Sequence, residues 1–142
     1  METTELHRGR LIDHIQLVVS DIEKSKVFYK AVFAALDIPL GGEGDDYFYC
    51  DELFISSMQS LASSGALTGR THLAFQAKDE ATVAKVYEAA LAAGGKDNGG
   101  PGMRRYHPGY YAAFFLDPDG NNIEAVFHGK AARSAPSVKI TF

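Results

Sequence analysis

The stretch THLAFQAKD, residues 71–79, decides the fold, because the earlier stretch DHIQLVVSD, residues 13–21, has the same form. In each, a histidine in second position precedes an alternating apolar run that ends at an aspartate. A shift of 58 positions places His14 on His72, and Tyr29 on Tyr87. A repeat of this kind predicts two copies of one structural unit, each burying a face against its neighbours.

Composition limits the class of protein. A chain of 142 residues is long enough for one domain with a sizeable core, and 46% apolar with 23% charged residues is ordinary for a soluble globular protein. The net charge of −4 gives no basic field for nucleic acid. The single cysteine, Cys50, excludes an internal disulfide framework and indicates a reduced, cytoplasmic protein.

No membrane or export segment is expected. No apolar run approaches the roughly 20 residues that a membrane-spanning helix needs. The N-terminal METTELHRGR has no hydrophobic core, so it is not a signal peptide.

Each half of the chain predicts a strand, a capped helix and further strands. Residues 21–36 and 80–94 have helical apolar spacing, and Asp21 and Asp79 suit the N-cap positions. Residues 46–50 and 53–59 are strand-like in the first half, as are 110–116 and 121–128 in the second, where the turn DPDG separates them. Further short strands are predicted near 38–40 and 102–106, and an edge strand is possible at 137–142.

The predicted fold class is α+β. A sheet made from two such halves would curl around a cleft, mostly antiparallel, with the helices outside. We expect a single domain over residues 1–142, with module one at about 11–58, module two at about 71–128 and a C-terminal tail at 129–142.

Three potential metal ligands fall on the same predicted side of the strands. Side chains alternate along a strand, so His14, His72 and Glu124 all lie opposite the apolar, helix-packing face. Two imidazoles and a carboxylate can occupy one face of an octahedral ion and leave positions open. Such a set suits Fe, Mn, Ni, Co or Zn, and the sequence does not choose among them.

The loop GGPGMRRYHPGYYAAF, residues 99–114, gathers basic and aromatic side chains beside the last predicted hairpin. Arginine anchors carboxylates or phosphonates, tyrosine stacks or donates a proton, and histidine titrates near neutrality. The predicted catalytic residues are Glu124, His107 and Tyr111, and the predicted substrate-binding residues are Arg104, Arg105, Tyr106 and Tyr110. The alternative is a loop that packs the hairpin or a dimer interface, with solvated arginines.

The chain resembles the vicinal oxygen chelate superfamily, which includes glyoxalase I, fosfomycin resistance enzymes, extradiol dioxygenases and bleomycin resistance proteins. The resemblance covers about residues 11–128 and is carried by the segments at 12–33, 71–95 and, most specifically, 110–128 with DPDGNNIE. It implies paired βαβββ modules, a homodimer, and His14, His72 and Glu124 as the metal set.

One departure bears on the reaction. Glyoxalase I-like members add a fourth ligand from the strand after the first helix, which we expect near Ile55 or Ser56, and neither side chain is a good ligand. Glyoxalase I activity is therefore not expected. Fosfomycin enzymes carry a tyrosine where this chain has Phe114, and extradiol enzymes usually contain more modules than 142 residues allow.

Two functions stay open. The first is a divalent-metal-dependent enzyme that acts on a small oxygen-chelating substrate as a lyase or isomerase, a thiol transferase or a dioxygenase. The second is a metal-free, bleomycin-resistance-like protein that sequesters a small molecule in an aromatic cleft. The retained His–His–Glu set favours the enzyme, because a binding cleft has no need of metal ligands.

Overall fold

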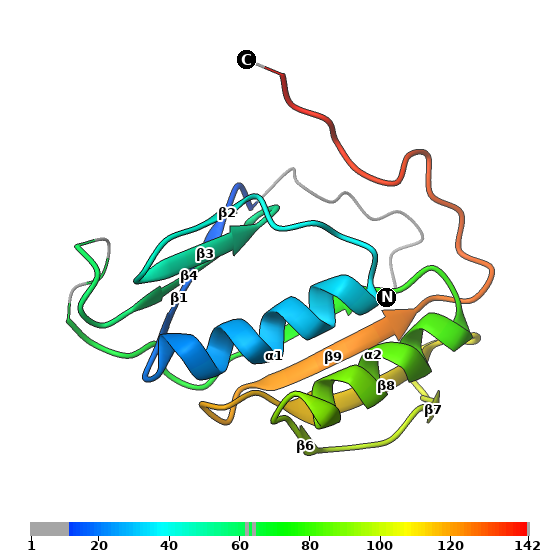
Figure 1. The fold of residues 1–142 in the computed structure, drawn as a ribbon. Coiled ribbons are helices and arrows are strands. Elements are labelled where there is room, and N and C mark those ends of the chain that lie inside the picture. Colours follow the sequence, from blue (N-terminus) through cyan, green and yellow to red (C-terminus); the bar gives the residue numbers. More distant parts are fainter. Residues whose placement is uncertain (1–11, 62, 64, 142) are drawn as a thin grey trace.

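The computed structural model describes residues 12–61, 63 and 65–141, and within them the chain forms two helices and nine strands (Figure 1). The N-terminal segment and the first residue of the expected module one lie outside the described residues. The first module contains β1 Ile15–Val19, α1 Ile22–Ala35, β2 Gly42–Glu43, β3 Tyr47–Cys50 and β4 Leu53–Ser57. The second contains β5 His72–Gln76, α2 Glu80–Ala92, β6 Lys96–Asp97, β7 Gly102–Met103, β8 Tyr111–Leu116 and β9 Asn122–Phe127.

The strands form two mixed sheets with the same topology. One has the order β1-β4-β3-β2, and the other has the order β5-β9-β8-β6 with β7 also paired to β8. The opening strand of each module runs parallel to the last, and the remaining pairs are antiparallel. The α+β class and the repeated module are thus confirmed. The strands lie in two separate sheets, however, rather than in one continuous curled sheet.

Both predicted helix caps are confirmed. The Asp21 side chain accepts a hydrogen bond from the backbone N–H of Lys24 at 3.1 Å, and Asp79 does the same for Thr82 at 2.7 Å. These bonds satisfy donors that the first turn of a helix leaves unpaired. Beyond the end of α2, Gly94 takes a φ of 103°, a backbone conformation that glycine adopts without strain.

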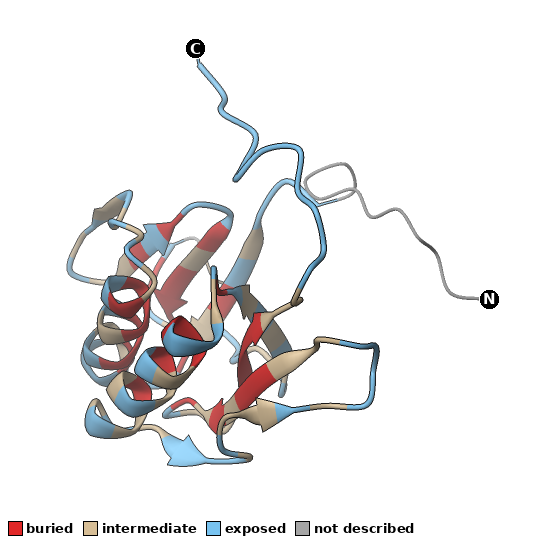
Figure 2. Cartoon of the chain, turned by 90° about the vertical axis from the view of Figure 1, so that its right-hand side faces the viewer, coloured by how far each residue is buried: buried red, intermediate tan, exposed pale blue. Residues whose placement is uncertain are grey.

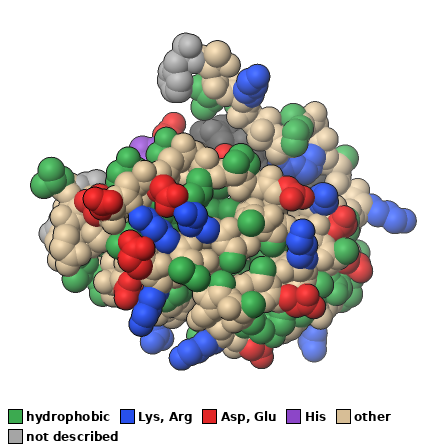
Figure 3. Space-filling model, viewed as in Figure 1, with side chains coloured by type: hydrophobic (Ala, Val, Ile, Leu, Met, Phe, Trp, Pro, Cys, Tyr) green, Lys and Arg blue, Asp and Glu red, His purple; other side chains and the backbone are tan. Residues whose placement is uncertain are grey.

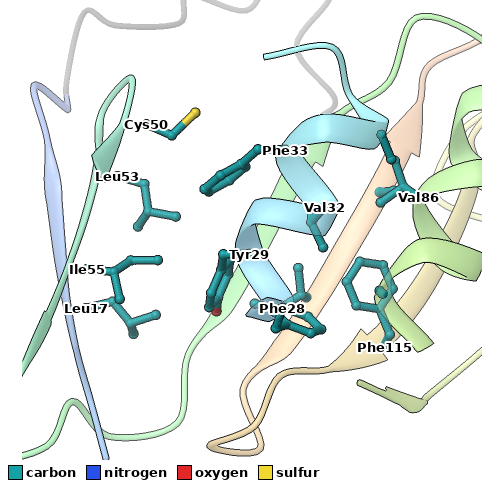
Figure 4. Close-up of a cluster of buried hydrophobic side chains, with 14 of the residues drawn as sticks. Leu17, Phe28, Tyr29, Val32, Phe33, Cys50, Leu53, Ile55, Val86 and Phe115 are labelled. Atoms are coloured by element: carbon teal, nitrogen blue, oxygen red, sulfur yellow. The ribbon is translucent and has the colours of Figure 1, made fainter. Parts of the chain in front are cut away.

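Helix α1 packs between the two sheets, so the modules share one core (Figures 1 and 4). The Tyr29 ring lies 6.2 Å from that of Phe48 in β3, while Phe28 lies 6.0 Å from Phe115 in β8. Phe33 also packs against Phe75 of β5, at 5.8 Å. This position differs from the expected outer location, and it turns the polar faces of both sheets away from α1.

A buried hydrogen bond joins the modules at this core. The Tyr29 hydroxyl donates to Oδ2 of Asp117 at 2.5 Å, from α1 to the turn between β8 and β9. Asp117 also accepts the backbone N–H groups of Asp119 at 3.0 Å and Asn121 at 2.8 Å. Burial, followed by the charge of Asp117, raises the pKa of Tyr29 well above its usual value.

Two segments differ from their predicted strands. The short strand expected at 38–40 occurs instead at β2, where the Tyr49 ring covers bare glycine backbone: a Cβ on Gly42 would lie 2.8 Å from Cε1 of Tyr49. In the tail, residues 129–141 form no strand, and Val138 and Ile140 are exposed. Phe142 lies outside the described residues.

Burial and charge are distributed as expected for a compact α+β protein. Buried residues gather between the helices and the strands that they cover (Figure 2). On the helix-covered face, acidic and basic side chains are interspersed without a region of one sign (Figure 3). Neither helix in the described part of the chain is long and apolar enough to cross a membrane.

Candidate functional site

The centre of the candidate site is a contact between His72 at the start of β5 and Glu124 in β9. The pairing of β5 with β9 places Ala74 opposite Glu124, so His72 is two residues from that position on the same face. Nε2 of His72 lies 3.0 Å from Oε2 of Glu124. The Glu124 side chain is 3% exposed and that of His72 is 49% exposed, so the pair opens to solvent on the histidine side.

The orientation of His72 is fixed by the backbone. Nδ1 lies 2.9 Å from the carbonyl oxygen of Asn122, an atom that can only accept a hydrogen bond. Nδ1 therefore carries a hydrogen, and Nε2 is the nitrogen directed at Glu124. The bond to the carbonyl fixes the orientation of the ring, as it does for histidines that bind metals. In the contact with Glu124, Nε2 donates a hydrogen to Oε2, and a bound ion would take the place of that hydrogen.

The second oxygen of Glu124 is held by Tyr110. The Tyr110 hydroxyl donates a short hydrogen bond to Oε1. Burial first, and then this hydrogen bond to Glu124, raises the pKa of Tyr110 above its usual range. Tyr110 thus stays protonated and leaves Oε2 as the carboxylate oxygen that faces His72.

The spacing of the pair fits a divalent metal ion. Two ligands about 2.1 Å from one ion, at an angle of 90°, lie about 3 Å apart. The Nε2–Oε2 distance of 3.0 Å, which is that of a hydrogen bond, is close to this value. The nitrogen and carboxylate donors suit the metals expected from the sequence, so His72 and Glu124 fit such an ion as two of its ligands.

Within one chain, His14 lies apart from the His72–Glu124 pair. Its side chain is exposed, and Nδ1 lies 2.6 Å from Oδ1 of Asp13 just before β1. Within the described ranges, no three His, Cys, Asp or Glu side chains come close enough together to hold an ion. The reason is the position of α1, because His14 and the His72–Glu124 pair belong to different sheets on either side of it.

An aromatic side chain extends the site toward Arg104. The Phe114 ring stacks beside His72, with centroids 6.1 Å apart. The guanidinium of Arg104 lies 5.3 Å from the centre of the Phe114 ring, and its Nη2 donates to the carbonyl of Gly100 at 2.7 Å. Arg104 is therefore held near the pair by the loop backbone and by a cation–π contact. Arg105 is exposed.

The other residues predicted from the loop divide between two places. The rings of Tyr106 and His107 pack against Tyr110, at 4.8 Å and 5.2 Å, so both lie near Glu124 through that residue. Tyr111, expected as a catalytic residue, packs against the core on the opposite face of β8. Alternation along β8 explains the difference, because the residues that share a face with Glu124 are those at even positions.

The first module has no carboxylate equivalent to Glu124. Glu124 pairs with Ala74, which lies two residues after His72. The residue two places after His14 is Gln16, and it pairs with Phe54. The expected position at Ile55 or Ser56 is therefore corrected to Phe54. Ile55 is fully buried on the core face, whereas Ser56 shares the face of Phe54 and accepts a hydrogen bond from Gln16 at 3.0 Å.

Sequence reasoning missed residues that position the site without touching it. Asn121 accepts the backbone N–H of Thr71 at 2.9 Å through Oδ1, which fixes the start of β5 next to His72. Its own amide Nδ2 donates to Asp117 at 2.8 Å. The run DPDGNN was recognised only as a turn. The signal available in the sequence was the polar residue Asn121 directly before a predicted strand that contains a glutamate.

Two βαβββ modules in tandem are the architecture of the vicinal oxygen chelate class of α+β proteins. The chain belongs to the Glyoxalase/Bleomycin resistance protein/Dioxygenase superfamily, whose family model matches residues 11–125. The resemblance drawn from the sequence is thereby confirmed.

Solved structures agree with this assignment. The chain is similar to a glyoxalase/bleomycin resistance protein from Albidiferax ferrireducens T118, with 27% identity, 82% of this chain and 98% of that chain covered, and a TM-score of 0.69. It is also similar to a glyoxalase-related enzyme from Fulvimarina pelagi, with 20% identity, 89% and 99% coverage and a TM-score of 0.64. A lactoylglutathione lyase from Agrobacterium tumefaciens matches with 21% identity, 83% and 93% coverage and a TM-score of 0.60. The last two likenesses concern the fold alone.

Proposed function

We propose that this chain is a divalent-metal-dependent enzyme that acts on a small substrate with two adjacent oxygen atoms. The observation that carries the proposal is the His72–Glu124 pair, in which Nε2 and Oε2 are 3.0 Å apart and each side chain is oriented by a second hydrogen bond. His14, supplied by a second copy of the chain, is the third ligand in this proposal. The family membership supports it, since many members of the superfamily are enzymes.

The chain's own residues would perform three tasks. A divalent ion bound by this set acts as a Lewis acid toward substrate oxygens. Glu124 balances the charge of the ion and, with one oxygen occupied by Tyr110, presents the other toward the open side of the site. Phe114 forms an apolar wall beside His72, and Arg104 places a positive charge at the edge of that wall for an anionic substrate group.

The number of carboxylates at the proposed site restricts the type of reaction without selecting one. Among the residues that the structure describes, only the second module provides a buried carboxylate on the open face, so a proton transfer that needs two metal-bound carboxylates does not fit. A thiol transfer, a dioxygenation, or a lyase or isomerase reaction with a single base remains consistent with one carboxylate and one arginine.

The test exploits the sharing of ligands between two copies. His14→Ala and His72→Ala should each abolish stoichiometric binding of Zn(II), Ni(II) or Mn(II) in calorimetric titration, with an unchanged circular dichroism spectrum. When the two variants are mixed and exchange subunits, each mixed dimer contains one site with both histidines and one with neither. Binding should therefore return in the mixture. Unchanged binding in both single variants would refute the site, and no recovery on mixing would refute the shared arrangement.

A second candidate function has its own support. Tyr47, Tyr49 and Phe54 form a row of nearly parallel rings on the open face of the first sheet: Tyr47 and Phe54 lie 5.6 Å apart at 13°, and Tyr49 and Phe54 lie 6.3 Å apart at 21°. Such a surface suits a flat, apolar ligand and would serve a metal-free binding protein of the bleomycin resistance type. Ligand binding that persists in EDTA and in His72→Ala, without turnover in any metal, would favour this candidate.

A further inference from the structure

Two glycines make a close backbone contact at the end of the candidate site. Gly109 and Gly129 have φ values of 84° and 64°. A Cβ on Gly129 would lie 2.9 Å from Cα of Gly109, and one on Gly109 would lie 3.2 Å from Cα of Gly129. Only residues without side chains permit this approach. The loop before β8 and the chain after β9 therefore cross here in van der Waals contact.

The crossing brings His107 and His128 together. Nε2 of His107 lies 2.9 Å from Nδ1 of His128, and the ring centroids are 5.1 Å apart with an angle of 24° between the ring planes. Nδ1 of His107 lies 2.9 Å from the carbonyl oxygen of Pro108, so it donates, and its Nε2 is the nitrogen directed at His128. This is the same posture as that of His72 toward Glu124.

The pair is both supported and reachable. The Tyr110 ring packs edge-on against His107 and His128, with both pairs of centroids 5.2 Å apart. His107 is exposed and His128 is half-buried, so an ion from solvent can reach the two nitrogens. Two neutral imidazoles side by side are a common ligand pair for transition metals.

The contact between the two nitrogens is a hydrogen bond. Its length of 2.9 Å and the centroid separation of 5.1 Å place the rings end to end, with the two nitrogens facing each other. An ion takes the place of this hydrogen when the rings turn so that both nitrogens face it. Among divalent first-row metals, Cu(II) binds such nitrogen ligands most tightly, ahead of Ni(II) and Zn(II).

We propose that His107 and His128 form a second metal site, selective for Cu(II) over Zn(II) and distinct from the His72–Glu124 pair. Water molecules complete the coordination. When the ion takes the place of the hydrogen between the two ring nitrogens, Nδ1 of His128 loses that proton and Nε2 of the same ring takes one up from solvent, so both imidazoles stay neutral. Tyr110 separates the sites, because its hydroxyl is bonded to Glu124 while its ring packs against both imidazoles.

The test is a titration of the full chain with Cu(II) alone, followed by calorimetry and electron paramagnetic resonance. His107→Gln and His128→Gln should each lose one equivalent of Cu(II) relative to the wild type, together with the resonance of a two-nitrogen site. His72→Gln should keep that equivalent, which separates this site from the one in the proposed function. Loss of the proposed enzyme site would leave this result unchanged.

A glycine variant tests the geometry while keeping both histidines. Gly129→Ala should lose the same equivalent, because the new Cβ forces the two backbone segments apart. Gly94→Ala is the matched control: Gly94 also has a positive φ, but a Cβ there meets nothing within 4 Å. If Gly129→Ala does not fold, the Cu(II) titrations of His107→Gln and His128→Gln test the proposal. An equal number of Cu(II) equivalents and an identical resonance spectrum in wild type, His107→Gln and His128→Gln would overturn the proposal.

Discussion

Phe54 in β4 occupies the position in the first module that Glu124 occupies in the second. Phe54 pairs with Gln16, two residues after His14. Glu124 pairs with Ala74, two residues after His72. The two copies of the repeat therefore differ at the position of the proposed metal-binding carboxylate. One sheet offers a carboxylate on its open face, and the other offers an aromatic ring.

This asymmetry predicts a weak or absent glyoxalase reaction. Conversion of the methylglyoxal–glutathione hemithioacetal moves a proton between adjacent carbons, and the first module supplies no carboxylate to share that task. We expect little or no turnover with Zn(II), Ni(II) or Mn(II) in the spectrophotometric assay. Efficient turnover by the wild type would show that another residue, within the loop at 103–111, serves as a base.

Restoring the missing carboxylate should strengthen metal binding. In Phe54→Glu, we expect at least about a tenfold increase in affinity, which corresponds to about 1.4 kcal/mol, because a fourth ligand and second carboxylate joins the set. Calorimetric titration with Zn(II) measures the change. Phe54→Leu is the matched control, since it removes the ring without adding a ligand, and a similar gain in that variant would contradict the explanation.

Removal of the Tyr110 hydroxyl should destabilise the fold. In Tyr110→Phe, the buried Oε1 of Glu124 loses its donor, and an unsatisfied buried polar group costs about 1–3 kcal/mol. Urea unfolding in the presence of EDTA measures this difference. Tyr106→Phe should change little, because Tyr106 is exposed and packs on Tyr110 only through its ring. Equal stability of the two variants would argue against the hydrogen bond.

Cys50 should make the protein sensitive to alkaline pH. Burial raises the pKa of the Cys50 thiol to about 12, and nearby Asp51 and Glu52 add to the effect. The unfolded chain releases this proton near pH 8.5 or above, while the folded chain retains it, so stability is complete below that pH and falls as pH rises toward 12. Urea unfolding at pH 8, 9 and 10 should show a steeper decline for the wild type than for Cys50→Ala. Parallel declines would assign the sensitivity to other groups.

The exposed sheet edges predict a dimer. In the described part of the chain, β1 and β5 each lie at the edge of a sheet, and Thr68 bonds to the outer edge of β1 through Val18. Open edges of this kind are usually paired or covered. Light scattering should give twice the mass of one chain. A strictly monomeric protein at tens of micromolar would contradict both the dimer and the shared metal site.

Much of the fold was predictable from the sequence, because the repeat and the local signals agree. Asp21 and Asp79 precede helical patterns and cap them, and the apolar alternation in 13–21 and 71–79 correctly separates the core face from the open face. The fold of each module is local in this sense. The packing of α1 between the sheets was not predictable, since it depends on which faces of Phe28, Tyr29 and Phe33 meet which sheet.

The site was predictable only in part, because it also depends on contacts between segments that are distant in the sequence. His72 and Glu124 were placed on one face by strand alternation, and the structure brings them together. Whether Tyr110 or Tyr111 contacts Glu124 depends on where β8 begins, and two adjacent tyrosines do not indicate that residue. The pairing of His107 with His128 depends on a contact between two glycines that are 20 positions apart.

The hydrogen bond from Tyr29 to Asp117 has a consequence for how the protein can be taken apart. Each end of that bond belongs to a different copy of the repeat, and both residues are buried. A fragment that contains one copy would lack the hydrogen-bond partner of its phenol or carboxylate, and the aromatic rings around α1 would lose neighbours from the other copy. We therefore expect a fragment of either half to fold poorly by itself, although each half has the complete set of strands of its sheet.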